Sequence, residues 1–261
     1  MKLSEIIARI EKRIPKSWAE SWDNPGLAVG DPGAEIDDIA LSLDATADTA
    51  SAASALGCGL LVTHHPLIFH PLKSVVNDSY VGRTVFSAIR GGVAIYSAHT
   101  NWDSSPEGVN FVLALLLGLE NIAPLSPSES GAWGMGAIGE LTVPIRLGEL
   151  SDILRERWRL ANFTVYGDGE RLLGRIALGG GACQEFWPEA LSLGADCFIT
   201  SDIAYHHRQE ALDAGLSLVS TDHGEMERAS LPALRTVIEC ETGLPVRLIE
   251  EKNAPFTHGR V

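Results

Sequence analysis

Positive charge is scarce in this sequence. Its 261 residues include 20 lysines and arginines against 34 aspartates and glutamates, which gives a formal net charge of −14. Nucleic acids and anionic membranes attract proteins through a positive field, so this charge argues against non-specific binding to either. The sequence also lacks an apolar run long enough to span a bilayer. We therefore expect neither a nucleic-acid partner nor a membrane location.

Cysteine is rare as well, and its residues form no recognisable pattern. Cys58, Cys183, Cys197 and Cys240 lie far apart, with no CxxC pair. A disulfide framework requires cysteines at regular, closer spacings, and free cysteines suit a reducing compartment. The first residues read as a capped amphipathic helix and contain no apolar segment of a signal peptide. These features predict a cytoplasmic protein.

Short apolar runs alternate with helical patterns along most of the chain. Strands are predicted at residues 39–43, 60–63 and 93–96, and helices between them at residues 46–56 and 80–90. This alternation is typical of an α/β fold with largely parallel strands. A segment rich in serine and proline, residues 124–131, is the best candidate for a boundary between two units.

The second half of the sequence repeats features of the first. Residues 57–63 align with residues 194–200, and residues 95–99 parallel residues 218–223. A duplication would give two related α/β lobes with mostly parallel or mixed sheets, although short strands also resemble one another by chance. Because ligands bind beyond the carboxyl ends of strands in open α/β sheets, the two lobes would share a site in the cleft between them.

Two adjacent histidines, His64 and His65, follow the predicted strand at residues 60–63. Polar rings at the end of a buried strand need partners, because unsatisfied ring nitrogens cost free energy. A metal ion would satisfy both rings. Hydrogen bonds to the backbone at a loop edge are the alternative.

Further imidazole and carboxylate groups follow other predicted strands: Asp103 with His99 nearby, Asp202, and the pair His223 and Glu227. Residues four apart share one face of a helix, so His223 and Glu227 can reach one ion if this segment is helical. Mixed imidazole and carboxylate ligands suit Zn, Mn, Fe or Co and do not suit Ca or Mg. Three histidines and two carboxylates are too many ligands for one metal ion that keeps an open position. They suit two divalent ions that share a bridging carboxylate.

The same residues give the sequence its resemblance to a known family. The segments HHPLIF, HTN-W-D and H-x3-E occur in this order, and matching stretches cover residues 22–30, 43–46, 63–69, 99–103, 139–141, 194–206 and 223–227. The sequence thus resembles the Nif-three-like family of dinuclear metal proteins, whose members are often named homologues of the type 2 form of GTP cyclohydrolase 1. Two departures are Ser201 before Asp202, where the family usually has Gly-Asp, and Gly-Gly-Gly-Ala at residues 179–182, where it usually has a Gly-Ser-Gly turn.

The resemblance implies that five residues bind two divalent metal ions: His64, His65, Asp103, His223 and Glu227. It also implies a ring-shaped homo-hexamer with its sites facing an internal cavity. We expect a first lobe at residues 1–125 together with about 222–261, which carries these ligands. The second lobe is expected at residues 126–221.

Two other histidines are candidates for catalytic roles. His99 could transfer a proton or orient Asp103. His206 could contact substrate, and a solvated loop histidine is the alternative. The glycine-rich turn at residues 178–182 lacks the GK[ST] ending of a phosphate-binding loop, so a plain tight turn is favoured.

The leading hypothesis is a dinuclear metal-dependent hydrolase that activates water and polarises a C=N, amide or phosphoryl group. The resemblance implies a nucleotide-like small molecule, such as the purine nucleotide of GTP cyclohydrolase chemistry, and phosphoester hydrolysis is the nearest enzymatic alternative. A different class is a ring-shaped scaffold or regulator with structural metals, although structural zinc sites are usually rich in thiolates and no cysteine belongs to this set. A metal-free α/β protein is the third alternative.

Overall fold

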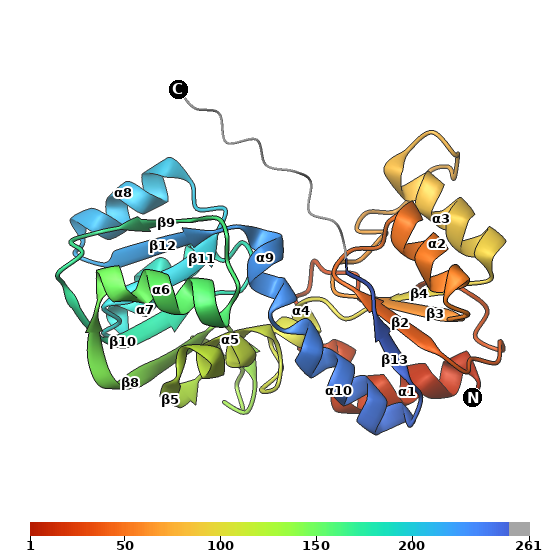
Figure 1. Ribbon diagram of the computed structural model, residues 1–261, viewed down its shortest axis with the longest axis horizontal. Helices are drawn as coiled ribbons and strands as arrows, with labels where there is room; N and C mark the ends of the chain where they lie inside the picture. Colours follow the sequence, from red (N-terminus) through yellow and green to blue (C-terminus); the bar gives the residue numbers. More distant parts are fainter. Residues whose placement is uncertain (251–261) are drawn as a thin grey trace.

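The computed structural model describes residues 1–250, which form two α/β lobes (Figure 1). The elements up to residue 135 are α1 (Leu3–Arg13), η1 (Lys16–Trp18), β1 (Gly26–Val29), β2 (Ile39–Ser42), α2 (Ala47–Ala55), β3 (Leu60–Thr63), α3 (Tyr80–Gly91), β4 (Ala94–Ser97), α4 (Thr100–Asp103), α5 (Val109–Leu117), β5 (Leu119–Ala123), β6 (Ser126–Pro127) and β7 (Gly134–Met135).

The remaining elements are β8 (Ala137–Arg146), α6 (Leu147–Arg157), β9 (Phe163–Tyr166), β10 (Leu172–Leu178), η2 (Gln184–Phe186), α7 (Trp187–Ser192), β11 (Cys197–Ser201), α8 (Tyr205–Asp213), β12 (Ser217–Thr221), α9 (His223–Arg228), α10 (Leu231–Thr242) and β13 (Val246–Leu248).

Two mixed sheets organise the structure. The five-stranded sheet has the order β1-β4-β3-β2-β13, and the six-stranded sheet has the order β5-β8-β10-β11-β12-β9. Within each sheet, three consecutive strands of the chain are parallel, and one antiparallel edge strand lies beside the last of them. The order β1-β4-β3-β2 therefore repeats as β9-β12-β11-β10. This repeat confirms the prediction of an α/β fold with two related lobes.

Local sequence explains where α2 begins and where α3 begins and ends. Thr46 caps α2, where its hydroxyl and that of Thr49 each accept a hydrogen bond from the other residue's backbone N–H. Ser79 caps α3 in the same way by accepting from the Gly82 N–H, and α3 ends at Gly92 in the left-handed conformation (φ 67°).

The strand before the two adjacent histidines, β3, is buried on both faces. Leu60 and Val62 pack in a cluster that includes Leu3 and Ile6 of α1, whereas Leu61 packs with Ala53 of α2. Figure 1 shows α2 and α3 on one side of this sheet and α1 and α10 on the other. Coverage of both faces explains why β3 reads as a continuous apolar run.

The last helix and strand of each repeat pack on the opposite lobe. β5 follows α5 and pairs with β8 in the six-stranded sheet, whereas β13 follows α10 and pairs with β2 in the five-stranded sheet. The blue α10 lies beside the red α1 in Figure 1, and Arg9 donates a hydrogen bond to the Glu241 carbonyl. The two lobes are thus tied together by a reciprocal exchange of chain segments.

This exchange differs from the expected division of the chain at residues 125 and 126. β5 lies in the sheet of the second lobe, because Gly118 ends α5 in the left-handed conformation and turns the chain directly into that sheet. The segment rich in serine and proline, residues 124–131, begins a loop on the surface of the fold, in which β6 of this segment pairs with β7 beyond it. Of the region expected to complete the first lobe, residues 251–261 lie outside the described part of the chain.

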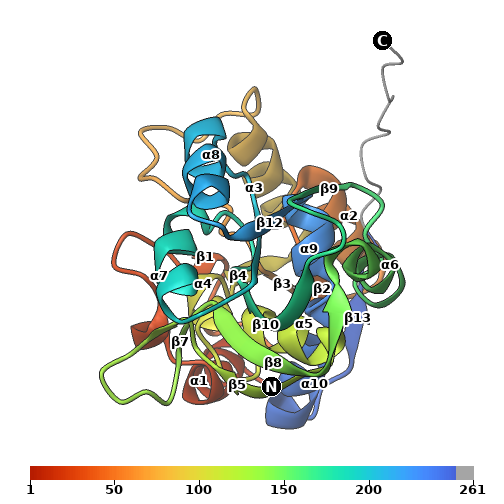
Figure 2. The same ribbon diagram turned by 90° about the vertical axis from the view of Figure 1, so that its left-hand side faces the viewer.

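No helix among the described residues has the length and apolar character needed to cross a membrane. Figure 2, a view turned by 90°, shows the helices of both lobes as short elements packed around the sheets. All four cysteines are free thiols, and only Cys240 is exposed.

Candidate metal centre

The five predicted metal ligands come together where strands of both lobes end. His64 and His65 directly follow β3, and Asp103 ends α4 just after β4. His223 and Glu227 lie on α9, one turn apart, just after β12. In Figure 1, α4 and α9 lie between the two sheets. The site thus occupies the position expected from the carboxyl ends of the strands.

Glu227 is the central residue of this cluster. Its Oε1 lies 3.0 Å from His223 Nε2 and 3.5 Å from His64 Nε2, and its Oε2 lies 3.0 Å from His65 Nε2. Only 2% of its surface is exposed. One buried carboxylate therefore faces three imidazoles that follow strands of both sheets, β3 and β12; His223 thus follows the six-stranded sheet, although it was expected in the first lobe.

Three groups of donor atoms lie within 4.8 Å of one another, which is close enough to share an ion. They are His64, Asp103 and Glu227; His65, His223 and Glu227; and His64, His65 and His99. Glu227 belongs to two of these groups. A carboxylate shared between two donor sets is the arrangement of a two-metal site.

Each imidazole of the cluster is oriented by a hydrogen bond from its Nδ1. The acceptors are Ala98 O for His64 (2.9 Å), Asp44 Oδ1 for His65 (2.7 Å), Asp23 Oδ1 for His99 (2.8 Å) and Asp202 Oδ2 for His223 (2.7 Å). In His64, His65 and His223 the Nε2 atom faces Glu227. Acceptors behind the rings are typical of histidines that bind metals, because they fix the tautomer and the ring direction.

Three buried atoms of the cluster have no hydrogen-bond partner within residues 1–250: His64 Nε2, Asp103 Oδ1 and Glu227 Oε2. The first two lie 3.5 Å apart, and both of their side chains are almost completely buried. An unsatisfied polar atom in the interior costs free energy. A divalent cation between the first two atoms would satisfy both. The residues present therefore fit a metal ion.

The buried carboxyl groups differ in protonation. Burial, together with the charge of Glu227, raises the pKa of Asp103 well above its usual value. Burial also acts to raise the pKa of Glu227, but His64 and the hydrogen bonds from the surrounding imidazoles hold it well below its usual value. Glu227 is thus the fixed negative charge of the metal-free site.

The histidines respond to the same environment. Burial lowers the pKa of His64, although the charge of Glu227 acts in the opposite direction. Burial opposes the charged form of His65 too, yet hydrogen bonds to Asp44 and Glu227 raise its pKa to about 10. Burial acts to lower the pKa of His223 as well, but hydrogen bonds to Glu227 and Asp202 raise it to about 9. The metal-free site therefore holds protons that a cation must replace.

The predicted tight turn at residues 178–182 lies against this cluster. Gly181 has a positive φ of +75°, and a Cβ atom there would lie 2.5 Å from Glu227 Oε1 and 3.2 Å from His223 Nε2. The Gly180 N–H is taken by Asn110 Oδ1 at 2.7 Å. The missing side chains allow the backbone to approach the carboxylate closely.

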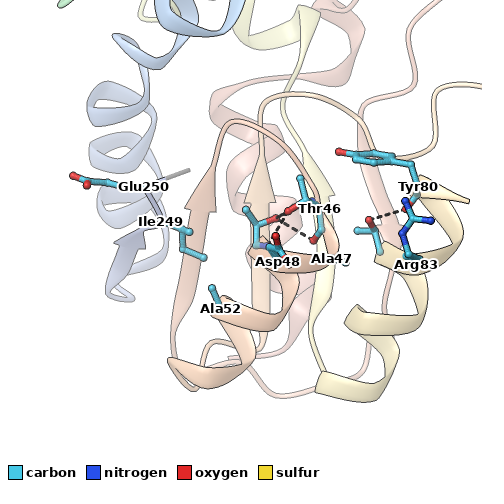
Figure 3. A pocket seen from close by; sticks show the side chains of 10 residues that line it. Thr46, Ala47, Asp48, Ala52, Tyr80, Arg83, Ile249 and Glu250 are labelled. Atoms are coloured by element: carbon cyan, nitrogen blue, oxygen red, sulfur yellow. Dashed lines mark hydrogen bonds between the residues drawn. The ribbon is translucent and has the colours of Figure 1, made fainter. Parts of the chain in front are cut away.

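A cavity of about 280 Å³ opens beside the cluster. Its wall includes Asp103, His223 and Glu227, together with the aromatic residues Trp22, Phe69 and Phe186. A larger cavity of about 640 Å³ lies between the N-terminal ends of α2 and α3 and the residues after β13 (Figure 3). Among residues 1–250, no histidine or cysteine lines that larger cavity, whereas His99 and His223 line the smaller one.

The two histidines with predicted catalytic roles lie in different places. His99 lines the small cavity, with its ring 5.2 Å from the ring of His64. His206 is exposed on α8, where its ring contacts Tyr205, and it does not line the cavity.

Sequence reasoning assigned no role to Asp23 or Asp44, which orient His99 and His65. Asp23 also accepts hydrogen bonds from the backbone and hydroxyl of Thr100. Burial acts to raise the pKa of Asp23, but His99 and Thr100 lower it to about 2. Both aspartates lie in stretches that carried the family resemblance, and Asp44 follows the carboxyl end of β2. That position is the signal that could have identified Asp44.

The fold and the cluster define an α/β protein of two related lobes with a candidate metal centre between them. A family model described as Duf34/NIF3 (NGG1p interacting factor 3) matches residues 1–255. The chain belongs to this family, which confirms the resemblance seen in the sequence.

Curated relatives match the chain over nearly its whole length. A protein of Clostridium perfringens named "GTP cyclohydrolase 1 type 2 homolog" is 35% identical and aligns over 98% of this chain and 99% of its own. A protein of the same name from Lactococcus lactis is 34% identical over 98% of this chain and 99% of its own.

Solved structures show the same fold. A Bacillus cereus protein related to NIF3 superposes with a TM-score of 0.92 at 21% identity, covering 98% of this chain and 99% of that one. Reduced HcgD from Methanocaldococcus jannaschii superposes with a TM-score of 0.81 at 27% identity, covering 96% and 98%.

Proposed function

We propose that this protein is a dinuclear metal-dependent hydrolase with its active site between the two lobes. The observation that carries the proposal is the position of Glu227, whose two carboxylate oxygens face His64, His65 and His223. The unpartnered atoms of His64 and Asp103 add a second reason to place a cation there.

The donor groups suggest how the ligands are divided. His64, Asp103 and Glu227 would hold one ion, and His65, His223 and Glu227 would hold the other. Imidazole and carboxylate donors favour Zn, Mn, Fe or Co. When bound, a pair of such ions supplies a Lewis acid and lowers the pKa of water.

His99 has the geometry of a proton acceptor beside these ligands. Its Nδ1 is held by Asp23, and its ring lies 5.7 Å from that of His65. The carboxylate of Asp23 would stabilise the protonated ring after it receives a proton from water. His99 also belongs to one donor group, so ligation is the competing role.

The names of the relatives suggest the substrate. Because both curated relatives are named as GTP cyclohydrolase 1 type 2 homologues, we propose a purine nucleotide whose C=N bond is hydrolysed. Phosphoester hydrolysis uses the same kind of two-metal site and is the nearest alternative. Scaffolding around structural metals is less well supported, since no cysteine is among the donors.

We also propose a ring-shaped homo-hexamer in the cytoplasm, as the family resemblance implies. The loop between β3 and α3 exposes Leu72, Val75 and Val76, which offer apolar surface for contacts between subunits. The free cysteines agree with a reducing compartment. Sedimentation analysis of the purified chain tests the assembly, and a monomer at micromolar concentration would contradict it.

The central experiment is metal reconstitution. The chelated full chain receives zero, one or two equivalents of Zn, Mn, Fe or Co, and hydrolysis of GTP and of p-nitrophenyl phosphate is measured. We expect turnover of one substrate to reach its maximum at two equivalents. Glu227→Gln should lose metal and turnover together, whereas His206→Ala, outside the cavity, should keep both. Undiminished turnover by a metal-free variant would disprove the proposal.

A further inference from the structure

The wall of the small cavity is aromatic on the side away from the ligands. Trp22 and Phe69 lie with ring centroids 5.8 Å apart, and the Trp22 ring lies 6.3 Å from the ring of His99. Trp22 is 58% exposed and Phe69 is 39% exposed, although large rings are usually buried. Exposed rings beside a reactive cluster offer a surface on which a planar ring can stack.

Apart from its two histidines, His99 and His223, the charged residues of the wall all have one sign. Besides Asp103 and Glu227, the cavity is lined by Glu20 and Glu185, and among the described residues neither lysine nor arginine lines it. Proteins that bind polyphosphates use Lys and Arg side chains, magnesium and helix N-termini to offset the charge of the chain of phosphates. Glu20 and Glu185 would instead repel phosphates that extend beyond the metal ions.

The turn at residues 178–182, which faces the candidate metal ligands, does not take the place of the lysine and arginine side chains that the wall lacks. Gly180 has its N–H occupied by Asn110, and the chain continues into η2 and the six-residue α7. Such short helices provide little of the dipole that favours anions at the start of longer helices. A single anionic group could still lie against the two metal ions.

The size of the cavity sets a similar limit. Its volume of about 280 Å³ lies just below the range of roughly 300–1,000 Å³ that is usual for ligand pockets. A bicyclic base with a small substituent matches this space. A ligand with a polyphosphate tail would extend past Glu20 and Glu185, which form the acidic rim of the cavity.

We infer that the substrate is a compact heteroaromatic compound of the purine type that carries at most one anionic group, a nucleoside or a nucleoside monophosphate, and no polyphosphate. This inference rests on the proposed function, because it places the reacting group at the metal ligands. The heteroaromatic ring stacks on Trp22 and Phe69. The acidic rim selects against the nucleoside triphosphate that the relatives' names suggest.

The test is calorimetric binding to the full chain loaded with two equivalents of Zn. Guanosine, guanosine monophosphate, GTP and inorganic triphosphate are the probes, and metal content is measured after each titration to detect removal of zinc by the phosphates. We expect guanosine and its monophosphate to bind at least tenfold more tightly than GTP, and inorganic triphosphate not to bind.

Variants separate the two parts of the inference. Trp22→Ala should weaken guanosine binding by about five- to a hundredfold, the range expected for loss of a stacked base, while Trp22→Phe restores it. The double change Glu20→Gln and Glu185→Gln should strengthen GTP binding and leave guanosine binding within twofold. All three variants should retain two zinc ions, since none of them alters a proposed ligand.

Several results would overturn the inference: GTP that binds as tightly as the monophosphate, no binding by either guanosine or its monophosphate, or unchanged guanosine binding in Trp22→Ala. Failure of the proposed function has a different signature, which is a wild-type chain that takes up no zinc. The four probes then report on the metal-free cavity, where the same order of affinity for guanosine and GTP is expected.

Discussion

The two lobes share a topology and differ in what they place at equivalent strand ends. β3 ends in Thr63, which is followed by His64 and His65, whereas β11 carries Thr200 and Ser201 and is followed by Asp202. In the first lobe both positions supply rings that face Glu227. In the second lobe, the Ser201 hydroxyl donates to Asp202, and Asp202 accepts from His223. The end of β3 thus supplies candidate ligands, and the end of β11 supplies a carboxylate that orients one of them.

The helices after the fourth strand of each repeat have diverged less. α4 follows His99 and ends in Asp103, while α9 carries His223 and Glu227, so each lobe presents a histidine and an acid four residues apart. The acid differs in length by one methylene group. The longer Glu227 reaches imidazoles of both lobes, whereas Asp103 Oδ1 lies 3.5 Å from His64. The repeated topology thus accounts for the shared scaffold, and the residues that differ at equivalent positions account for the asymmetric site.

The largest effect is expected from removing the charge of Glu227. Glu227→Gln should lower the affinity for both metal ions by more than the roughly 10–100-fold typical of groups behind the ligands, because its oxygens belong to two donor groups. Asp103→Asn should lose only one equivalent, since Asp103 belongs to one group. Metal content after dialysis distinguishes the two variants, with the exposed Glu210→Gln as control. Equal losses of metal in the two variants would contradict the different roles assigned to Glu227 and Asp103.

A smaller effect is expected from the two equivalent histidines. His223→Ala should lose about one equivalent of metal, because His223 Nε2 lies 3.0 Å from Glu227 and His223 belongs to one donor group, with His65 and Glu227. His99→Ala should keep both ions and lose activity, in keeping with a role in proton transfer. Metal analysis together with turnover tests this difference. Loss of metal by both variants would make His99 a ligand equivalent to His223.

The repeat and the clustering of the candidate ligands could be predicted from sequence for the same reason. Apolar strands followed by His, Asp or Glu mark the carboxyl ends of parallel strands, and these ends converge in the folded protein. The orienting residues Asp23 and Asp44 were not assigned, because hydrogen bonds behind the rings depend on approach between segments 76 and 21 residues apart. The exchange of β5 and β13 between the sheets depends on tertiary pairing, which local patterns do not encode.

A moderate loss of metal affinity is expected when Asp202, the carboxylate that orients His223, is replaced. Asp202→Asn should weaken metal binding by about 10–100-fold, because the amide accepts less strongly from His223 Nδ1 than the carboxylate does. Asp44→Asn tests the corresponding support of His65 in the first lobe. The exposed Asp213→Asn serves as control in competition titrations with a chelator. Unchanged affinity in Asp202→Asn would mean that His223 is oriented by its position on α9 alone.

The smallest effect is a dependence of stability on pH that changes with metal. In the chelated protein, hydrogen bonds to carboxylates raise the pKa of His65 from 6.5 to about 10 and that of His223 to about 9, against the effect of burial. A raised histidine pKa stabilises the folded state fully below pH 6.5, and this contribution is lost as pH rises through 9 and 10.

The melting temperature of the chelated protein should therefore fall between pH 7 and pH 10, by about 2–4 °C for each kcal/mol of stability lost. The metal-loaded protein should not show this loss, because the ions replace those protons and bind more tightly as pH rises. His65→Gln should flatten the profile of the chelated protein more than His223→Gln, since the pKa of His65 is raised further. Scanning calorimetry of chelated and loaded samples over this range makes the measurement. Parallel profiles in the two samples would show that Glu227 and its histidines do not exchange protons for metal.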